Sequence, residues 1–196
     1  MKSWPFTTTA VSVRQFDPKN RVDEVARQYL MKELTWEEAH VKMAEWYGTN
    51  GKLELAVREY YAISKAIPYN VSPVLRMGRL YLSAGKNAEA EGAFEKSLKI
   101  APSLHAYQGL GFLALQKGNP AEATQMLERA LVYSAGVQPN DVLETQQYLA
   151  VALAGSGRLP EAKKIAEAMV ASHPEYREGR DLLRDIEGAM QRSPVR

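Results

Sequence analysis

The chain has 196 residues, of which 45% are hydrophobic, with 25 basic and 23 acidic side chains interspersed and no cysteine. This length and hydrophobic content can build a sizeable core, while the balanced charge disfavours nucleic acid or an anionic membrane as partner, since either would select a basic stripe. The lack of cysteine excludes disulfides and thiol chemistry, and no stretch of the sequence approaches the roughly 18 apolar residues of a membrane span.

Residues 1–20 mix aromatic and β-branched side chains with threonines and two prolines, which predicts an extended or irregular segment without a binding role. Residues 21–34 carry an apolar stripe at helical spacing and are expected to form an N-terminal capping helix. The string Thr35-Trp36-Glu37-Glu38 is a capping box, so the next helix should begin there.

Four columns of residues then recur along the chain at a period close to 34. The first holds small residues and the second glycine, at Ala44, Gly78, Gly111 and Ala150 and at Gly51, Gly85, Gly118 and Gly157. The third is alanine and the fourth proline, at Ala56, Ala90, Ala123 and Ala162 and at Pro68, Pro102, Pro139 and Pro174. Such a period indicates stacked units that share one continuous core.

Each unit shows two helical stripes joined at its glycine, which is expected to supply the left-handed residue of a short turn. The four units cover about residues 37–70, 71–104, 104–139 and 141–174. The distance from alanine to proline is 12 residues in three repeats but 16 in the third, so a lengthened helix or loop is expected near Tyr133–Val137.

The small columns are expected to mark helix crossings, where two axes come within about 8–10 Å. Gly78 should then meet Ala90. Leucine at either position would overpack the crossing by about 1–3 kcal/mol or more, whereas alanine at Gly78 should be mild.

These columns resemble the tetratricopeptide repeat (TPR), a helix-turn-helix unit of the same period. The second repeat matches the family pattern almost position by position, at Gly78, Tyr81, Gly85, Ala90, Phe94 and Pro102. The resemblance covers Glu37 to Pro174. The sequence departs from the family pattern where the family often has tryptophan, at His40, Val74, Tyr107 and Gln146, and where it prefers alanine, at Ile63 and Met169. It implies an all-α fold, a right-handed superhelix (α-solenoid) of four repeats.

Residues 175–191 place apolar and charged side chains on opposite faces of a helix, which predicts a C-terminal capping helix followed by a tail at 192–196. We expect no enzyme, metal or cofactor, because the three histidines are scattered and neither a nucleophile elbow nor a phosphate loop is complete.

The resemblance also implies a concave groove lined by the first helix of each repeat, in which TPR proteins hold peptides. The positions carried over are Glu45, Leu75, Arg79, Leu82, His105, Gln108, Phe112, Leu115, Gln147 and Val151. Phe112 and Arg79 are the expected anchors, with Gln108 available to a peptide backbone. For Leu82 and Leu115, packing between repeats is an equal alternative.

We therefore expect a protein-interaction module or scaffold whose partner is a protein or peptide segment with apolar and acidic groups. The family's lysine-and-asparagine carboxylate clamp is not expected, because Val41 and Glu45 stand at its first two positions. The alternative is a domain that oligomerises with itself or docks within a larger, exported protein. A cytoplasmic location is slightly favoured, and a periplasmic or exported one applies if a leader has been trimmed.

Overall fold

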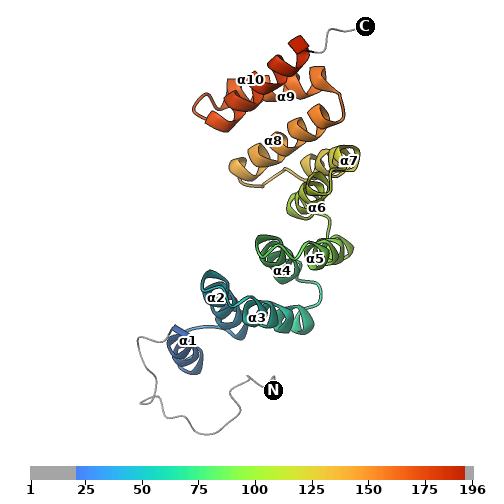
Figure 1. Ribbon diagram of the computed structural model, residues 1–196. Helices are drawn as coiled ribbons and strands as arrows, with labels where there is room; N and C mark the ends of the chain where they lie inside the picture. Colours follow the sequence, from blue (N-terminus) through green and yellow to red (C-terminus); the bar gives the residue numbers. More distant parts are fainter. Residues whose placement is uncertain (1–20, 193–196) are drawn as a thin grey trace. The chain divides into compact units, whose positions relative to one another are not determined.

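The computed structural model describes residues 21–192, whose regular elements are ten α-helices (Figure 1). In chain order they are α1 (Arg21–Leu30), α2 (Trp36–Thr49), α3 (Leu53–Ala66), α4 (Ser72–Ser83), α5 (Asn87–Ile100), α6 (Leu104–Gln116), α7 (Pro120–Val132), α8 (Pro139–Gly155), α9 (Leu159–Ser172) and α10 (Arg177–Arg192). The all-α prediction is confirmed. The predictions for residues 1–20 and for the tail from residue 193 on lie outside the described residues.

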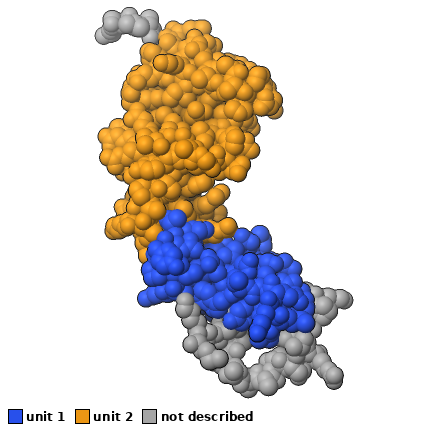
Figure 2. All heavy atoms as spheres, turned by 180° about the vertical axis from the view of Figure 1, so that it is seen from behind, with its two compact units in different colours: residues 1–73 blue, residues 74–196 orange. Residues whose placement is uncertain are grey.

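The chain divides into two compact units, residues 1–73 and 74–196, which are described separately (Figure 2). In the first unit α2 packs on α3, with Ala44 and Ala56 fully buried. The predicted capping box opens α2: the Thr35 hydroxyl accepts from the Glu38 backbone N–H at 3.2 Å, and the Glu38 carboxylate accepts from the Thr35 N–H at 2.7 Å. This backbone hydrogen bond lowers the pKa of Glu38.

A buried polar pair joins α2 to α3 in this unit. His40 Nδ1 lies 2.6 Å from Glu59 Oε2, and the two residues are only 3% and 2% exposed. Arg58 Nη2 approaches the second carboxylate oxygen of Glu59 at 3.3 Å. The repeat pattern did not predict this pair, although Glu59 lies between Ala56 and Tyr60 on the stripe that α3 buries.

The inter-helix turns follow the glycine column. Gly51, Gly85, Gly118 and Gly157 have φ angles of 68°, 70°, 71° and 77°, a region in which a side chain would meet the backbone. The predicted left-handed turns are confirmed, and they bring each pair of helices into a short hairpin.

The second unit corrects the expectation for Gly78. A Cβ built on Gly78 would stand 2.7 Å from the Phe94 ring, and one built on Gly109 of α6 would stand 2.5 Å from the same ring. Phe94 is 1% exposed and therefore occupies a slot between two glycine backbones. Alanine at Gly78 would clash with the ring, so we no longer expect it to be mild.

The four extra residues of the third repeat enlarge both the loop and the following helix. Residues 133–138 connect α7 to α8, and α8 is 17 residues long against 12 to 14 in α2 to α7. Tyr133 in this loop stacks on Tyr107 of α6 with ring centroids 5.7 Å apart. Pro139 occupies the first turn of α8, so it opens the fourth repeat instead of closing the third.

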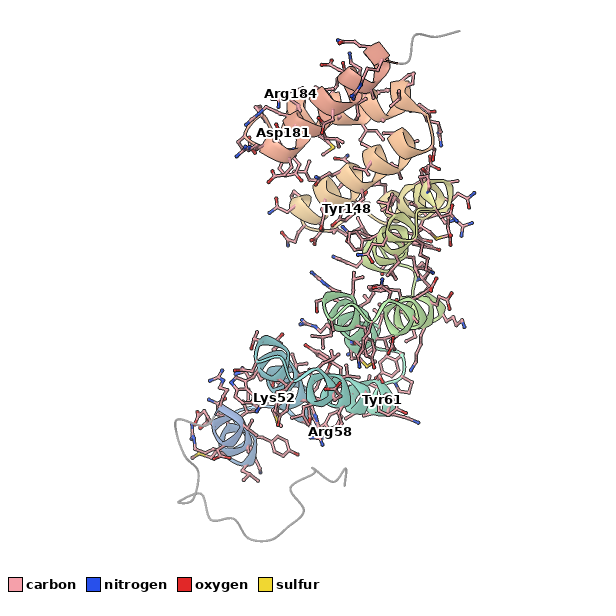
Figure 3. All side chains as sticks on the ribbon, viewed as in Figure 1. Lys52, Arg58, Tyr61, Tyr148, Asp181 and Arg184 are labelled. Carbon is pink, nitrogen blue, oxygen red and sulfur yellow. The ribbon has the colours of Figure 1, made fainter. Side chains whose placement is uncertain are left out.

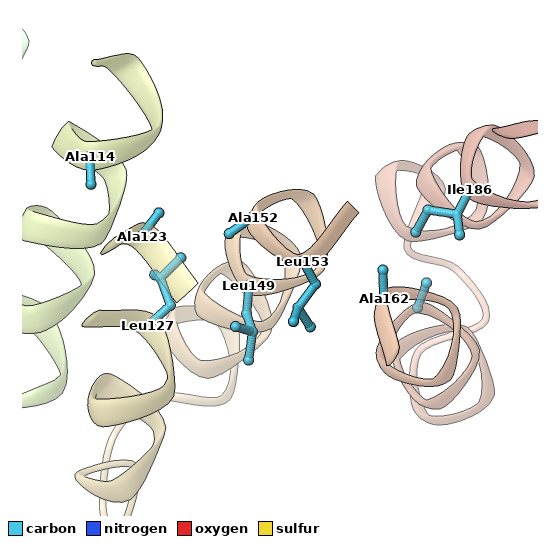
Figure 4. Close-up of a cluster of buried hydrophobic side chains, with 9 residues drawn as sticks. Ala114, Ala123, Leu127, Leu149, Ala152, Leu153, Ala162 and Ile186 are labelled. Carbon is cyan, nitrogen blue, oxygen red and sulfur yellow. The ribbon is translucent and has the colours of Figure 1, made fainter. Parts of the chain in front are cut away.

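The C-terminal helix α10 packs on α9. Ile186 points from α10 toward α9 and is buried in one cluster with Ala162, Leu153 and Leu149 (Figure 4). Leu182, Leu183 and Met190 are partly buried against the same cluster. No helix within residues 21–192 is long and apolar enough to cross a membrane.

Candidate functional site

The second unit contains a cleft of about 380 Å³ between α4, α6 and α8. This volume lies in the lower part of the range of about 300–1,000 Å³ for ligand pockets. Its walls are formed by Arg79, Leu82 and Ser83 of α4, Phe94 of α5, His105, Gln108, Gly109, Phe112 and Gln116 of α6, and Glu144 and Tyr148 of α8.

Two facing helix stripes build the α6–α8 side of the cleft. His105, Gln108 and Phe112 recur at i, i+3 and i+7 along α6, so they share one face. Their partners on α8 are Asp141, Glu144 and Tyr148. We call these three pairs the α6–α8 ladder.

Two rungs of the ladder are contacts between polar or charged side chains, and the third is a contact between two aromatic rings. His105 Nε2 lies 3.1 Å from Asp141 Oδ2, and Gln108 Nε2 donates to Glu144 Oε2 at 3.1 Å. In the third rung the rings of Phe112 and Tyr148 are 5.2 Å apart at their centroids and tilted by 52°. Tyr148 is labelled on α8 in Figure 3.

Glu144 is the central carboxylate of the ladder. Its second oxygen, Oε1, accepts from the Tyr148 hydroxyl at 2.7 Å. Burial, followed by this hydrogen bond and the charge of Glu144, raises the pKa of Tyr148, so the phenol remains a donor at neutral pH. Glu144 is exposed and forms no ion pair with any residue between 21 and 192.

Arg79 stands on the α4 wall and carries the opposite charge. Its side chain is exposed and makes no hydrogen bond or ion pair with the described residues. Two other cations of this unit, by contrast, are paired: Lys117 Nζ lies 2.7 Å from Glu91, and Arg158 Nη2 lies 2.6 Å from Glu161. As far as the described part of the chain goes, the cleft thus has an uncompensated cation on one wall and an uncompensated carboxylate on another.

The floor of the cleft is apolar. Phe112 is half-buried and faces Tyr148, and the Phe94 ring reaches the cleft beside Gly109. Because a Cβ on Gly109 would stand 2.5 Å from that ring, the glycine lets the Phe94 ring lie against the backbone of α6 at the floor.

Five of the ten predicted groove residues line the cleft: Arg79, Leu82, His105, Gln108 and Phe112. Gln108 Nε2 donates to Glu144, so the contact predicted between Gln108 and a peptide backbone, which stays a prediction, would use its second N–H or its carbonyl oxygen. Tyr148 was not predicted. The available signal was its position four residues after Glu144, which puts both on one helix face.

The other five predicted residues lie elsewhere and remain predictions. Leu75 and Leu115 are partly buried against core clusters. Gln147 accepts a hydrogen bond from the Tyr176 hydroxyl, Val151 is exposed on α8, and Glu45 is exposed on α2 in the first unit. The described residues contain no group of three or more histidine, aspartate or glutamate side chains arranged to hold a metal ion.

Several solved structures share this fold. MamA from Desulfovibrio magneticus RS-1 superimposes with a TM-score of 0.68 at 18% identity, over 81% of this chain and 87% of that one. YrrB, described as a TPR protein with an unusual peptide-binding site, gives a TM-score of 0.65 at 18% identity, over 85% of this chain and 84% of that one.

A human protein is similar in sequence over part of the chain. Protein O-mannosyl-transferase TMTC1 is 33% identical over 98 residues, which cover 50% of this chain and 10% of that protein. The chain therefore spans about a tenth of the length of this relative.

The tetratricopeptide repeat family model matches residues 74–104 and 104–132, which correspond to the α4–α5 and α6–α7 hairpins. The two matches fall on repeats that the sequence columns delimit, and their glycine turns and buried alanines recur in α2–α3 and in α8–α9. The chain is therefore a tetratricopeptide repeat protein.

Proposed function

We propose that the chain is a non-enzymatic protein-binding module that holds a segment of a partner protein in the cleft between α4, α6 and α8. The observation that carries this proposal is the cleft itself, which is lined by a half-buried aromatic floor and by the guanidinium of Arg79, and this guanidinium has no partner within residues 21–192. Aromatic residues and arginine supply most of the binding energy in protein interfaces. An apolar side chain on Phe112 with an acidic group at Arg79 matches these two features.

The comparisons support protein binding as the general role, because tetratricopeptide repeats serve as protein-binding modules and YrrB is described as having a peptide-binding site. The transferase named in the human relative is not proposed for this chain, since the similar stretch covers 10% of that protein. The alternative role, a domain that self-associates or docks within a larger protein, is tested by the same experiment.

The test is a selection from a display library of random nonapeptides on the immobilised chain, followed by calorimetric titration of the enriched peptides. We expect Phe112→Ala and Arg79→Glu each to weaken binding by about tenfold or more, which corresponds to about 1.4 kcal/mol. Val132→Ala is the matched control, because Val132 is 76% exposed on α7 of the same unit and does not line the cleft.

Arg79→Glu guards the test against misfolding, because the exposed Arg79 has no partner among the described residues whose loss could destabilise the fold. Enriched peptides that bind both cleft variants as well as the parent would overturn the proposal. A library that yields no enriched sequence, together with a mass in solution that shows a stable oligomer, would favour the alternative role.

A further inference from the structure

We infer that the cleft is polarised and selects a segment with charges of both signs: an acidic group that pairs with Arg79 and a basic side chain, lysine or arginine, that pairs with Glu144. This inference rests on the proposed function and adds the partner's second charge to it.

The first step is the state of the Glu144 carboxylate. It is held by two neutral donors, the Gln108 amide at 3.1 Å and the Tyr148 hydroxyl at 2.7 Å, and by no cation within residues 21–192. Neutral donors orient a carboxylate without cancelling its charge. Because a carboxylate has about four acceptor positions, Glu144 keeps capacity for a charged donor from a ligand.

The second step is the rigidity of this wall. The other two rungs of the ladder flank Glu144, with His105 and Asp141 3.1 Å apart on one side and the Phe112 and Tyr148 rings 5.2 Å apart on the other. The carboxylate is therefore fixed on a surface built from two helices. A site held in this way loses little side-chain entropy when a ligand binds.

The third step is charge complementarity across the cleft. Arg79 on α4, Phe112 on α6 and Glu144 on α8 line the same cavity. Neither Arg79 nor Glu144 forms an ion pair with an opposite charge among the described residues. A segment with only an acidic group would leave Glu144 without a counter-charge. A segment with only a basic group would leave Arg79 without one. A segment with an acid, an apolar side chain and a base matches all three walls.

The acidic group could come from an aspartate or glutamate side chain or from the partner's C-terminal carboxylate, since both offer Arg79 the same fork of oxygens. Two libraries separate these sources. One displays random nonapeptides with a free C-terminus, and the other displays them within a loop that has no free end. Enrichment of an acidic side chain in the second library identifies an internal segment, whereas binding confined to the first identifies the terminal carboxylate.

The decisive comparison repeats both selections on Glu144→Gln, which keeps the size of the side chain and one acceptor oxygen and removes the charge. Glu95→Gln is the matched control, because Glu95 is an exposed acid on α5 that does not line the cleft. We expect the parent and Glu95→Gln to enrich lysine or arginine and Glu144→Gln to lose that preference. Replacing the basic residue of an enriched peptide with glutamine should weaken binding about tenfold to the parent and leave binding to Glu144→Gln unchanged.

The two hypotheses fail in different ways. Enriched peptides that depend on Phe112 but show no basic preference, or a basic preference that survives in Glu144→Gln, would overturn the polarised cleft and leave the proposed function standing. Peptides that do not depend on Phe112 would overturn the proposed function itself. Equal urea midpoints for the parent and Glu144→Gln verify that the comparison concerns folded proteins.

Discussion

The slot that holds Phe94 makes Gly109→Ala the sharpest test of the packing in the second unit. The added Cβ would stand 2.5 Å from Cε2 and Cζ of the ring, whereas carbon atoms in contact lie about 3.5–4.0 Å apart. The ring would have to withdraw by roughly 1 Å. Its opposite edge already lies against α4, 2.7 Å from where a Cβ of Gly78 would stand, and Phe94 is 1% exposed, so little room is available.

Two effects of opposite sign determine the magnitude. Overpacking of this kind costs about 1–3 kcal/mol. Replacing glycine with alanine inside a helix recovers up to about 1 kcal/mol of helix propensity. The net loss of unfolding free energy is therefore about 0–2 kcal/mol, and Gly109→Ala by itself could hide the clash.

Gly92→Ala separates the two effects. Gly92 is exposed within α5, and nothing lies within 4 Å of its Cβ position, so alanine there should stabilise the protein by up to about 1 kcal/mol. Urea unfolding followed by circular dichroism should place Gly109→Ala below Gly92→Ala by about 1–3 kcal/mol. In a Phe94→Leu background the difference should shrink. Equal stability of the two alanine variants would refute the slot.

Two further predictions concern the buried parts of each unit. His40→Leu should lower the unfolding free energy by about 3–5 kcal/mol, because it leaves the Glu59 carboxylate buried without its 2.6 Å partner, and the double variant with Glu59→Leu should recover part of that loss. A double variant no more stable than His40→Leu in urea unfolding would count against the pair. Ile186→Asp should place a charge in the cluster that α10 covers and cause self-association, which light scattering detects. The control Arg184→Asp, on the exposed face of α10, should remain monodisperse. A monodisperse Ile186→Asp protein would contradict the covering role of α10.

Much of the fold could be predicted from the sequence because its determinants are local. A glycine at a helix-hairpin turn is required by the φ angle of that single residue, as Gly51 and Gly157 show at 68° and 77°. The capping box of Thr35 and Glu38 acts over three residues. The turn glycines and the buried alanines belong to each repeat by itself. Because they recur at a fixed period, they can be recognised in the sequence without knowledge of how the helices pack.

The candidate site was only partly predictable, because its geometry depends on the rotation and offset of neighbouring helices. Arg79 and Phe112 could be assigned to groove positions from the repeat, but the pairing of Gln108 with Glu144 joins residues that are 36 positions apart. That offset includes the lengthened loop at 133–138 and the start of α8. No local pattern specifies which side chains such an insertion brings into register.

The same reason explains the buried Glu59 and the slot around Phe94. A carboxylate on an apolar stripe is disfavoured by residue type alone, and its contacts with His40 across the hairpin and with Arg58 compensate its burial. The role of Gly109 follows from the position of a ring on another helix. The sequence by itself determined the repeat, its turns and its buried columns, whereas the tertiary structure decided which charges remain unpaired and face one cleft, because charge compensation is set by distances between helices and not by spacing along the chain.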